Sequence, residues 1–387
     1  MNIARKLWEK SRNLLPVEGF YFDRPLVLFQ SDDWGRVGVR DQQGWEQLRA
    51  EGINLGERPY DFYTLETAED VAALGSLLHE HRDSAGHHPC IEMNFILFNL
   101  DFGRMRADNF ASIHLLPLSD GLPEGWSRTG LLEAYREGIR GGLFATALHG
   151  TTHFCCSAVE AHLDMGDHGE LLRTLWRAGT PYIYWRMPWI GYEYWDPGKT
   201  EDERFLSVDQ QRECIGAAVG AFAKMFSALP KSACAPGYRA NEETHRVWAQ
   251  HGIHVAQNGP GTYTPPYFDR KELLHLSRTV EFEPATDSEF SMERALSEAE
   301  ACFERGLPAI ISMHSINFHS TLRNFRSQTL NALEQFLQVL ESRNPGLLYL
   351  RDEEMVEVIR KGKHGDVSVK VTKKAFTKAR PDRQVHA

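Results

Sequence analysis

One apolar stretch, residues 26–35 (LVLFQSDDWG), constrains the fold more than any other part of the chain. It begins with the composition of a buried strand and ends in two adjacent carboxylates, Asp32 and Asp33, followed closely by a glycine. Two acids at the mouth of a buried strand cost free energy unless a cation or a catalytic task uses them. The alternative is an acidic turn, which Asp and Gly favour without any function.

Strand-like and helix-like stretches alternate along the rest of the chain, and this rhythm predicts an α/β fold with a mostly parallel sheet. For 387 residues we expect a barrel or barrel-like closure, with the chemistry where strand ends meet the following loops. The predicted helices cover residues 45–50, 68–81, 129–138, 208–229, 242–250, 289–305, 326–342 and 353–360. The predicted strands cover residues 89–100, 143–148, 232–235, 253–257, 273–282, 308–313 and 347–350.

The chain divides into three parts by composition, and the second contains an insert. Residues 1–20 predict an N-terminal amphipathic helix, and residues 21–360 predict a single folded domain. An aromatic-rich insert, residues 154–200, interrupts this domain as an irregular stretch. Residues 361–387 are basic and polar and predict a disordered, solvated tail, with a weak electrostatic tether as the alternative.

Composition and charge argue against several classes of function. The net charge of -10 argues against a nucleic-acid binder, whose surface would be basic. No apolar run reaches the length of a membrane span, and the N-terminus lacks the uninterrupted apolar centre of a secretion signal. The six cysteines form neither a disulfide framework nor a CxxC zinc pattern. We therefore expect a cytoplasmic, reduced protein without a transmembrane segment.

A second polar motif, His149-Gly150-Thr151-Thr152-His153, also follows an apolar strand candidate. Two histidines at positions i and i+4 reach one ion if the loop makes one helical turn. Imidazole suits zinc and its neighbours, and one carboxylate completes a three-ligand site that stays open for water. Because a parallel barrel brings strand ends to one face, the Asp pair and the His pair predict a metal site together.

These motifs resemble those of the polysaccharide deacetylase superfamily (the NodB homology domain, carbohydrate esterase family four). Ser31-Asp32-Asp33 and His149 to His153 resemble its first two motifs, residues 234–239 (CAPGYR) its third, and residues 310–314 (IISMH) its fifth. The resemblance covers about residues 24 to 358. It implies a distorted (β/α) barrel of seven or eight mostly parallel strands.

The resemblance also implies site roles. Asp32 would be the base that takes a proton from water, Arg239 would orient Asp32, and His314 would protonate the leaving amine. One divalent metal ion, Zn²⁺ first and Co²⁺, Ni²⁺, Fe²⁺ or Mn²⁺ as alternatives, would be held by Asp33, His149 and His153.

The sequence departs from the family pattern in its second and third motifs. Gly150 stands where the family has Ser or Thr, so a loop hydrogen bond is missing or comes from Thr151 or Thr152. Arg239 follows the proline of its motif, whereas the family arginine precedes it. Arg186, which precedes a proline, is therefore the alternative to Arg239, although it lies in the insert.

The fourth motif, an acid that tunes the catalytic histidine, is not evident from the sequence. The candidates on one late predicted strand are Arg278, Glu281 and Glu283, and Asp287 follows them in the sequence. Each of these could equally be a solvated charge at the strand end.

The insert is dense in tyrosine and tryptophan between residues 182 and 195, and aromatic faces suit sugar rings. The alternatives are a packed lid and an oligomer interface, so a homo-oligomer stays open. Four polar residues of the insert read as exposed loop positions rather than as a second ion site: His162, Asp164, Asp167 and His168. The candidate substrate-binding residues are Trp34, Arg186, Trp189, Trp195 and Tyr238.

Together the motifs predict a metal-dependent hydrolase that removes an N-acyl group from a sugar or sugar-like substrate. Two alternatives remain from the sequence. One is an amidohydrolase of the same superfamily that acts on a small non-sugar C–N bond, and the other is an inactive barrel that binds glycans or a partner protein. The retained Asp32, Asp33, His149, His153 and His314 favour an active enzyme.

Overall fold

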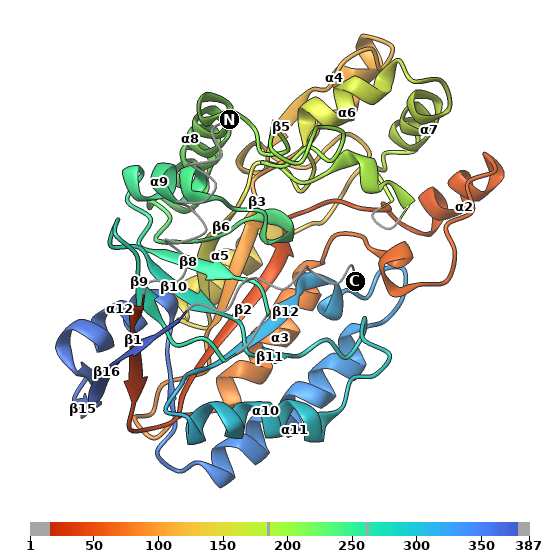
Figure 1. The fold of residues 1–387 in the computed structure, drawn as a ribbon. Coiled ribbons are helices and arrows are strands. Elements are labelled where there is room, and N and C mark those ends of the chain that lie inside the picture. Colours follow the sequence, from red (N-terminus) through yellow and green to blue (C-terminus); the bar gives the residue numbers. More distant parts are fainter. Residues whose placement is uncertain (1–15, 184–185, 261–262, 378–387) are drawn as a thin grey trace.

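A computed structural model describes residues 16–183, 186–260 and 263–377. A curled sheet occupies its centre, and helices surround the sheet (Figure 1). Neighbouring strands follow the order β11-β12-β2-β3-β6-β7-β8-β10, and each pair in this series is parallel. The bounds are β2 (Leu26–Trp34), β3 (Ile91–Ile96), β6 (Phe144–Gly150), β7 (Ser232–Cys234), β8 (Val255–Asn258), β10 (Leu274–Ser277), β11 (Val280–Glu281) and β12 (Ala309–His314).

The chain itself closes the curl. Strand β10 pairs with β8, and β11, which begins after two further residues, pairs with β12. The connecting residues also bond to both sides: the Arg278 amide donates to the Asn258 carbonyl (3.2 Å), and the Thr279 amide to the Ile310 carbonyl (3.0 Å). Two short strands lie beside this series, β9 (Tyr267–Phe268) on β10 and β13 (Leu348–Tyr349) on β2. The prediction of a distorted barrel of seven or eight mostly parallel strands is confirmed.

The helices connect successive strands and pack on the outside of the sheet. Helix α3 begins where the sequence predicted, because the Thr67 hydroxyl accepts the Asp70 amide and the Asp70 carboxylate accepts the Thr67 amide. The helices are α2 (Gln42–Ala50), α3 (Ala68–Glu80), α4 (Phe102–Ala107), α5 (Leu131–Arg140), α6 (Cys156–Leu163), α7 (Gly166–Arg177), α8 (Val208–Phe226), α9 (Glu242–Gln250), α10 (Met292–Glu304), α11 (Arg326–Arg343) and α12 (Asp352–Lys361).

The insert is not an irregular stretch throughout, so that expectation is wrong for its first half. Residues 156–177 form α6 and α7, and α7 buries Leu172, Leu175 and Trp176 at helical spacing. The density of aromatic residues had obscured this periodicity in the sequence. A shorter 3₁₀ turn follows at Pro188–Ile190.

Both chain ends differ from the sequence prediction. Residues 17–20 belong to a strand, β1 (Val17–Phe22), rather than to a helix; residues 1–15 lie outside the described residues. The tail expected to be disordered forms β14 (Lys363–His364), β15 (Val367–Ser368) and β16 (Val371–Phe376), and residues 378–387 lie outside the description. Antiparallel pairing of β1 with β16 explains both corrections. Each strand provides backbone hydrogen-bond partners for the other, and Phe20 and Phe22 are buried in the core.

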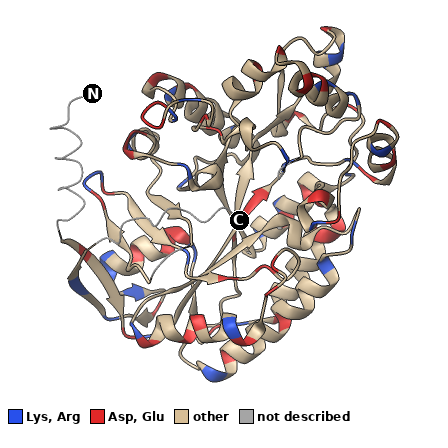
Figure 2. Ribbon diagram, turned by 45° about the vertical axis from the view of Figure 1, so that its right-hand side comes forward, with Lys and Arg blue, Asp and Glu red and all other residues tan. Residues whose placement is uncertain are grey.

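The tip of β2 carries acidic residues at the centre of the molecule, whereas most other charged positions lie on outer helices and loops (Figure 2). Among the described residues, no helix combines the length and apolar character needed to cross a membrane.

Candidate metal centre

Asp32 and Asp33 lie at the end of β2 and point in different directions. The pairing of β2 with β3 shifts register between Ser31 and Trp34, and Asp33 has a positive φ of 75°. A bulge of this kind re-aims side chains at the rim of a barrel. Both carboxylates are buried. Because they point in different directions, they contact different sets of side chains.

Asp33 faces the two histidines of the second motif. Its Oδ1 lies 3.5 Å from Nε2 of His149 and 3.3 Å from Nε2 of His153. Two ligands of one tetrahedral zinc ion, each about 2.0–2.1 Å from it, lie about 3.4 Å apart. All three side chains are buried, and Oδ1 of Asp33 has no hydrogen-bond partner among the residues that the structure describes. A buried, unpartnered carboxylate oxygen beside two imidazoles fits a divalent cation.

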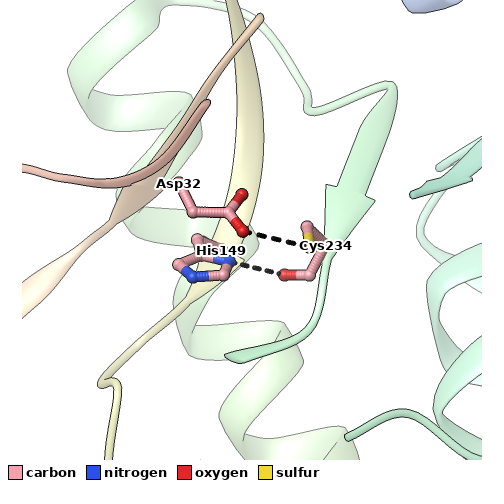
Figure 3. A group of neighbouring side chains, drawn as sticks. All are labelled: Asp32, His149 and Cys234. Atoms are coloured by element: carbon pink, nitrogen blue, oxygen red, sulfur yellow. Dashed lines mark hydrogen bonds between the residues drawn. The ribbon is translucent and has the colours of Figure 1, made fainter. Parts of the chain in front are cut away.

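Both histidines of this group direct Nε2 toward Asp33. Nδ1 of His149 lies 2.9 Å from the carbonyl oxygen of Cys234, so this nitrogen is the donor and Nε2 keeps its lone pair toward Asp33 (Figure 3). Burial, with the charge of Arg36, lowers the pKa of His153 to about 3, so His153 stays neutral. Neutral imidazole is the form that binds metals.

A second trio, Asp32, His149 and Cys234, also lies within ligand reach (Figure 3). Burial raises the pKa of the Cys234 thiol well above its usual range, and only a thiolate is a good ligand. His149 already uses Nδ1 for the Cys234 carbonyl. The Asp33 trio is therefore the better metal site of the two.

The sequence did not single out Arg36, which forms a buried ion pair with the metal-site carboxylate. Its guanidinium lies 3.3 Å from Oδ2 of Asp33, donates to the Tyr182 hydroxyl (3.1 Å) and stacks on the Tyr63 ring (3.8 Å). Tyr63 also donates its hydroxyl to the Asp33 carbonyl (2.9 Å). Burial alone would raise the pKa of Asp33, but Arg36 and the histidines outweigh it and hold that pKa well below its usual range.

Asp32 points into the barrel, where Arg278 holds it in a bidentate pair. The guanidinium donates to Oδ1 (2.6 Å) and Oδ2 (2.9 Å), and Asn94 donates a further hydrogen bond to Oδ1 (2.5 Å). Arg278 also donates to Gln30 (3.2 Å) and Gln257 (3.0 Å), and none of its side chain is exposed. Burial would raise the pKa of Asp32, but Arg278 and nearby imidazoles outweigh it and keep Asp32 ionised.

The prediction that Arg239 orients Asp32 is wrong, because Arg278 occupies that place. Arg239 stacks instead on two aromatic rings of the insert, Trp195 (4.8 Å) and Tyr192 (5.8 Å). Its position after the proline turns its side chain toward the insert. Arg278 was considered only as a residue that tunes the catalytic histidine, and its actual partner is the base candidate.

His314 ends β12 and faces Asp32 across the site, with Nε2 3.9 Å from Oδ2. Its Nδ1 lies 2.6 Å from Glu283, and Asn317 donates to the other oxygen of that carboxylate (2.6 Å). Glu283 is thus the residue of the fourth-motif candidates that contacts His314, whereas Glu281 is exposed. Burial would lower the pKa of His314, but Glu283 and the site aspartates raise it to about 9.

We expect Glu283→Gln to move the alkaline limb of the kcat profile to lower pH. A general acid must be protonated, so kcat falls as pH rises through its pKa. Removing the adjacent negative charge lowers the pKa of His314, by about 1 unit or more. A bound cation would lower this pKa in both proteins without changing the direction of the shift. The pH dependence of kcat in both proteins measures the effect.

Glu281→Gln is the matched control, since it removes the same charge two residues away without a bond to His314. Its alkaline limb should stay close to that of the wild type. Equal shifts in the two variants would contradict a specific role of Glu283.

The loop between the two metal-site histidines depends on a buried acid of the insert. The Thr151 amide donates to Glu193 (2.7 Å), the Thr151 hydroxyl donates to the same oxygen, and the Thr152 hydroxyl donates to the Phe154 carbonyl (2.7 Å). Gly150 has a φ of 112°, and a Cβ there would lie 2.8 Å from Cδ of Glu193. Glycine is therefore required for both backbone and space, and the two threonines supply the expected loop bonds. His149 lies in a strand, so the two histidines do not share a helical turn.

Two of the predicted substrate-binding residues serve packing. Trp34 is fully buried and stacks on Phe318 (5.8 Å), so its prediction as a substrate contact is wrong. Trp189 stacks on His162 and His168 of α6 and α7, with 4.4 Å between ring centroids in each case. These contacts account for Trp189 as a packing residue of the insert.

The remaining three candidates have different surroundings. Tyr238 accepts a hydrogen bond from Arg278 (2.9 Å). Trp195 stacks on Arg239, the residue that follows Tyr238. Arg186 lies 3.4 Å from Asp61 and does not contact the base candidate. A pocket opens beside the metal-site ion pair instead, and its polar and aromatic lining consists of Arg36, Tyr60, Asp61, Tyr63 and Tyr182.

No family model matches the sequence, and no curated protein does. Among solved structures, a probable polysaccharide deacetylase from Pseudomonas aeruginosa PAO1 is 14% identical, with 88% of this chain and 92% of that chain covered and a TM-score of 0.46. A family 4 carbohydrate esterase from Streptomyces lividans in complex with acetate is 13% identical (84% and 92% covered, TM-score 0.35). Puue allantoinase is 12% identical (87% and 90% covered, TM-score 0.43).

Proposed function

We propose that this protein is a metal-dependent hydrolase that removes an N-acyl, acetyl-like group from a sugar or sugar-like substrate. One observation carries the proposal: Oδ1 of Asp33 faces Nε2 of His149 and of His153, has no hydrogen-bond partner among the described residues, and lies beside an opposed pair, Asp32 and His314. A cation site next to one ionised carboxylate and one protonated imidazole supplies the Lewis acid, base and acid of metal-assisted acyl hydrolysis.

Asp33, His149 and His153 would hold the cation, with Zn²⁺ as the ion best suited to this ligand set. A divalent cation there supplies Lewis acidity, which polarises an acyl oxygen and makes a nearby water easier to deprotonate. Arg36 and the Cys234 carbonyl fix the orientation of the ligands that they contact.

The two proton-transfer residues act from opposite sides. Asp32 is ionised and accepts the proton of the attacking water, while Arg278 and Asn94 hold its carboxylate in place. His314 carries a proton, with Nδ1 fixed on Glu283 and Nε2 directed into the site, and gives that proton to the leaving nitrogen. His314 is also the most exposed of these side chains, at 27%, so the leaving group departs on its side.

The substrate would bind beside His314 and the tyrosine-lined pocket. Tyr60 lies edge-on to the His314 ring (6.4 Å), and tyrosine rings with hydroxyl groups suit sugars. The deep burial of the metal-site residues favours a second candidate, a small non-sugar amide. The six cysteines are free, which supports a reducing compartment such as the cytoplasm.

Hydrolysis should be assayed with zinc-loaded protein against N-acetylated and N-formylated amino sugars and against small acyl amides. Release of acetate or formate from an amino sugar, abolished by Asp33→Asn, is the expected result. Turnover of the small amides alone would favour the second candidate. Glycan binding without any turnover by metal-loaded protein would contradict the proposal and indicate an inactive binding barrel.

A further inference from the structure

A second group of potential metal ligands lies where the barrel strands begin, away from the tip of β2. Asp83 and His87 lie in the connection between α3 and β3, and His364 lies in β14. Figure 1 shows α12 and β15, the neighbours of β14 along the chain, at the lower left of the view. A six-residue strand such as β3 is roughly 20 Å long, so this group is separate from the Asp33 site.

The three side chains converge. One carboxylate oxygen of Asp83 and one ring nitrogen from each histidine lie within 4.8 Å of one another. Oδ2 of Asp83 is 3.4 Å from Nδ1 of His87, which is about the separation of two ligands on one zinc ion. The rings of His87 and His364 meet edge to face, with 4.7 Å between centroids.

The carboxylate is fixed before any ion binds. Oδ1 of Asp83 accepts the amides of Ala85 (2.8 Å) and His87 (2.9 Å), and Oδ2 accepts the Tyr349 amide (3.0 Å). Its side chain is completely buried. Backbone donors of this kind orient a ligating carboxylate, while a buried negative charge favours a cation beside it.

His364 supplies a second, independent observation. Only 8% of it is exposed, yet its Nε2 has no hydrogen-bond partner in the described part of the chain. A buried polar atom without a partner costs about 1–3 kcal/mol, so a ligand for this ring would be stabilising. His87 is 48% exposed and gives an ion access to the group.

We propose that Asp83, His87 and His364 form a second divalent-cation site, structural rather than catalytic, that takes Zn²⁺ or a similar ion. The ion would tie the β14–β15 hairpin to the connection between α3 and β3. These two segments lie far apart in the sequence, and the hairpin strands have only two residues each. A metal clip that closes a long stretch of chain restricts the unfolded state.

Zinc content after dialysis of full-length protein tests this site in a His149→Ala background, where the proposed catalytic site is disabled. We expect about one zinc ion per His149→Ala chain, and almost none once His87→Ala or His364→Ala is added. His87 is exposed, so His87→Ala should fold even if His364→Ala does not. Cobalt substitution adds a spectroscopic readout, because the visible band of bound Co²⁺ should disappear in the same double variants.

His88→Ala is the matched control, since it removes a neighbouring histidine outside the group and should leave the zinc content unchanged. Absence of zinc from the His149→Ala protein would overturn the second site, as would zinc that neither His87→Ala nor His364→Ala removes. The outcome is independent of the proposed function. If the Asp33 site bound no metal, His149→Ala would match the wild type while His87→Ala still removed one ion.

Discussion

Replacing Arg278 with methionine is expected to destabilise the protein by about 3–5 kcal/mol, because it leaves the buried carboxylate of Asp32 without its charged partner. The variant should also lose at least about 10²-fold in kcat, since Asp32 would be neither held in place nor kept ionised. Denaturant unfolding measures the first effect, and steady-state kinetics on the metal-loaded protein measures the second.

Arg239→Met is the control for this experiment. It removes the same charge, but from a residue that stacks on Trp195 rather than on the base candidate. We expect a smaller loss of stability and a kcat within a few-fold of the wild type. If Arg239→Met were inactive while Arg278→Met kept full activity, Arg239 would be the residue that orients Asp32, as the motif order suggested.

The second large effect concerns the base and the acid. Asp32→Asn and His314→Ala should each lower kcat by roughly 10²–10⁴-fold, the scale for loss of a positioned proton-transfer group. Both variants should keep their metal, because neither residue belongs to the Asp33 trio. Measuring kcat and metal content on the same samples separates proton transfer from metal binding.

Asp33→Asn provides the contrast, since it should lose the ion of the Asp33 trio together with activity, whatever a second site still holds. Metal loss from Asp32→Asn with retention in Asp33→Asn would reverse the assignment of the two carboxylates. Full activity of both proton-transfer variants would contradict the hydrolytic mechanism.

The sequence predicted the barrel because strand and helix periodicities are local properties. The strand expected at residues 308–313 is β12 (Ala309–His314), and the helix expected at residues 242–250 is α9. That the Asp pair meets His149 and His153 was also predictable, since parallel strands deliver their ends to one face of a barrel, while the choice of Asp33 came from the family resemblance.

The remaining contacts depend on tertiary structure that no local pattern encodes. Arg278 reaches Asp32 from the point where the chain passes from β10, paired with β8, to β11, paired with β12, and closes the barrel. Glu193 supports the histidine loop from within the insert, more than 40 residues along the chain from Thr151, and no motif links the two positions. Arg36 pairs with Asp33 only because a bulge turns that carboxylate aside.

The chain ends show the same limit of local reasoning. The lysine-rich composition after residue 361 is typical of disordered tails, and the sequence offers no sign that β16 has a partner strand. That partner, β1, lies at the other end of the chain and was taken for part of a helix. Long-range pairing between β1 and β16 therefore overrode the local preference of both segments.

The most direct test of the central claim is an anomalous difference map from crystals of the zinc-loaded protein. The account predicts a peak among Oδ1 of Asp33, Nε2 of His149 and Nε2 of His153, about 2.0–2.2 Å from each atom. A peak that instead joined Asp32, His149 and Cys234, or no peak at the tip of β2 in crystals with zinc bound elsewhere, would contradict it.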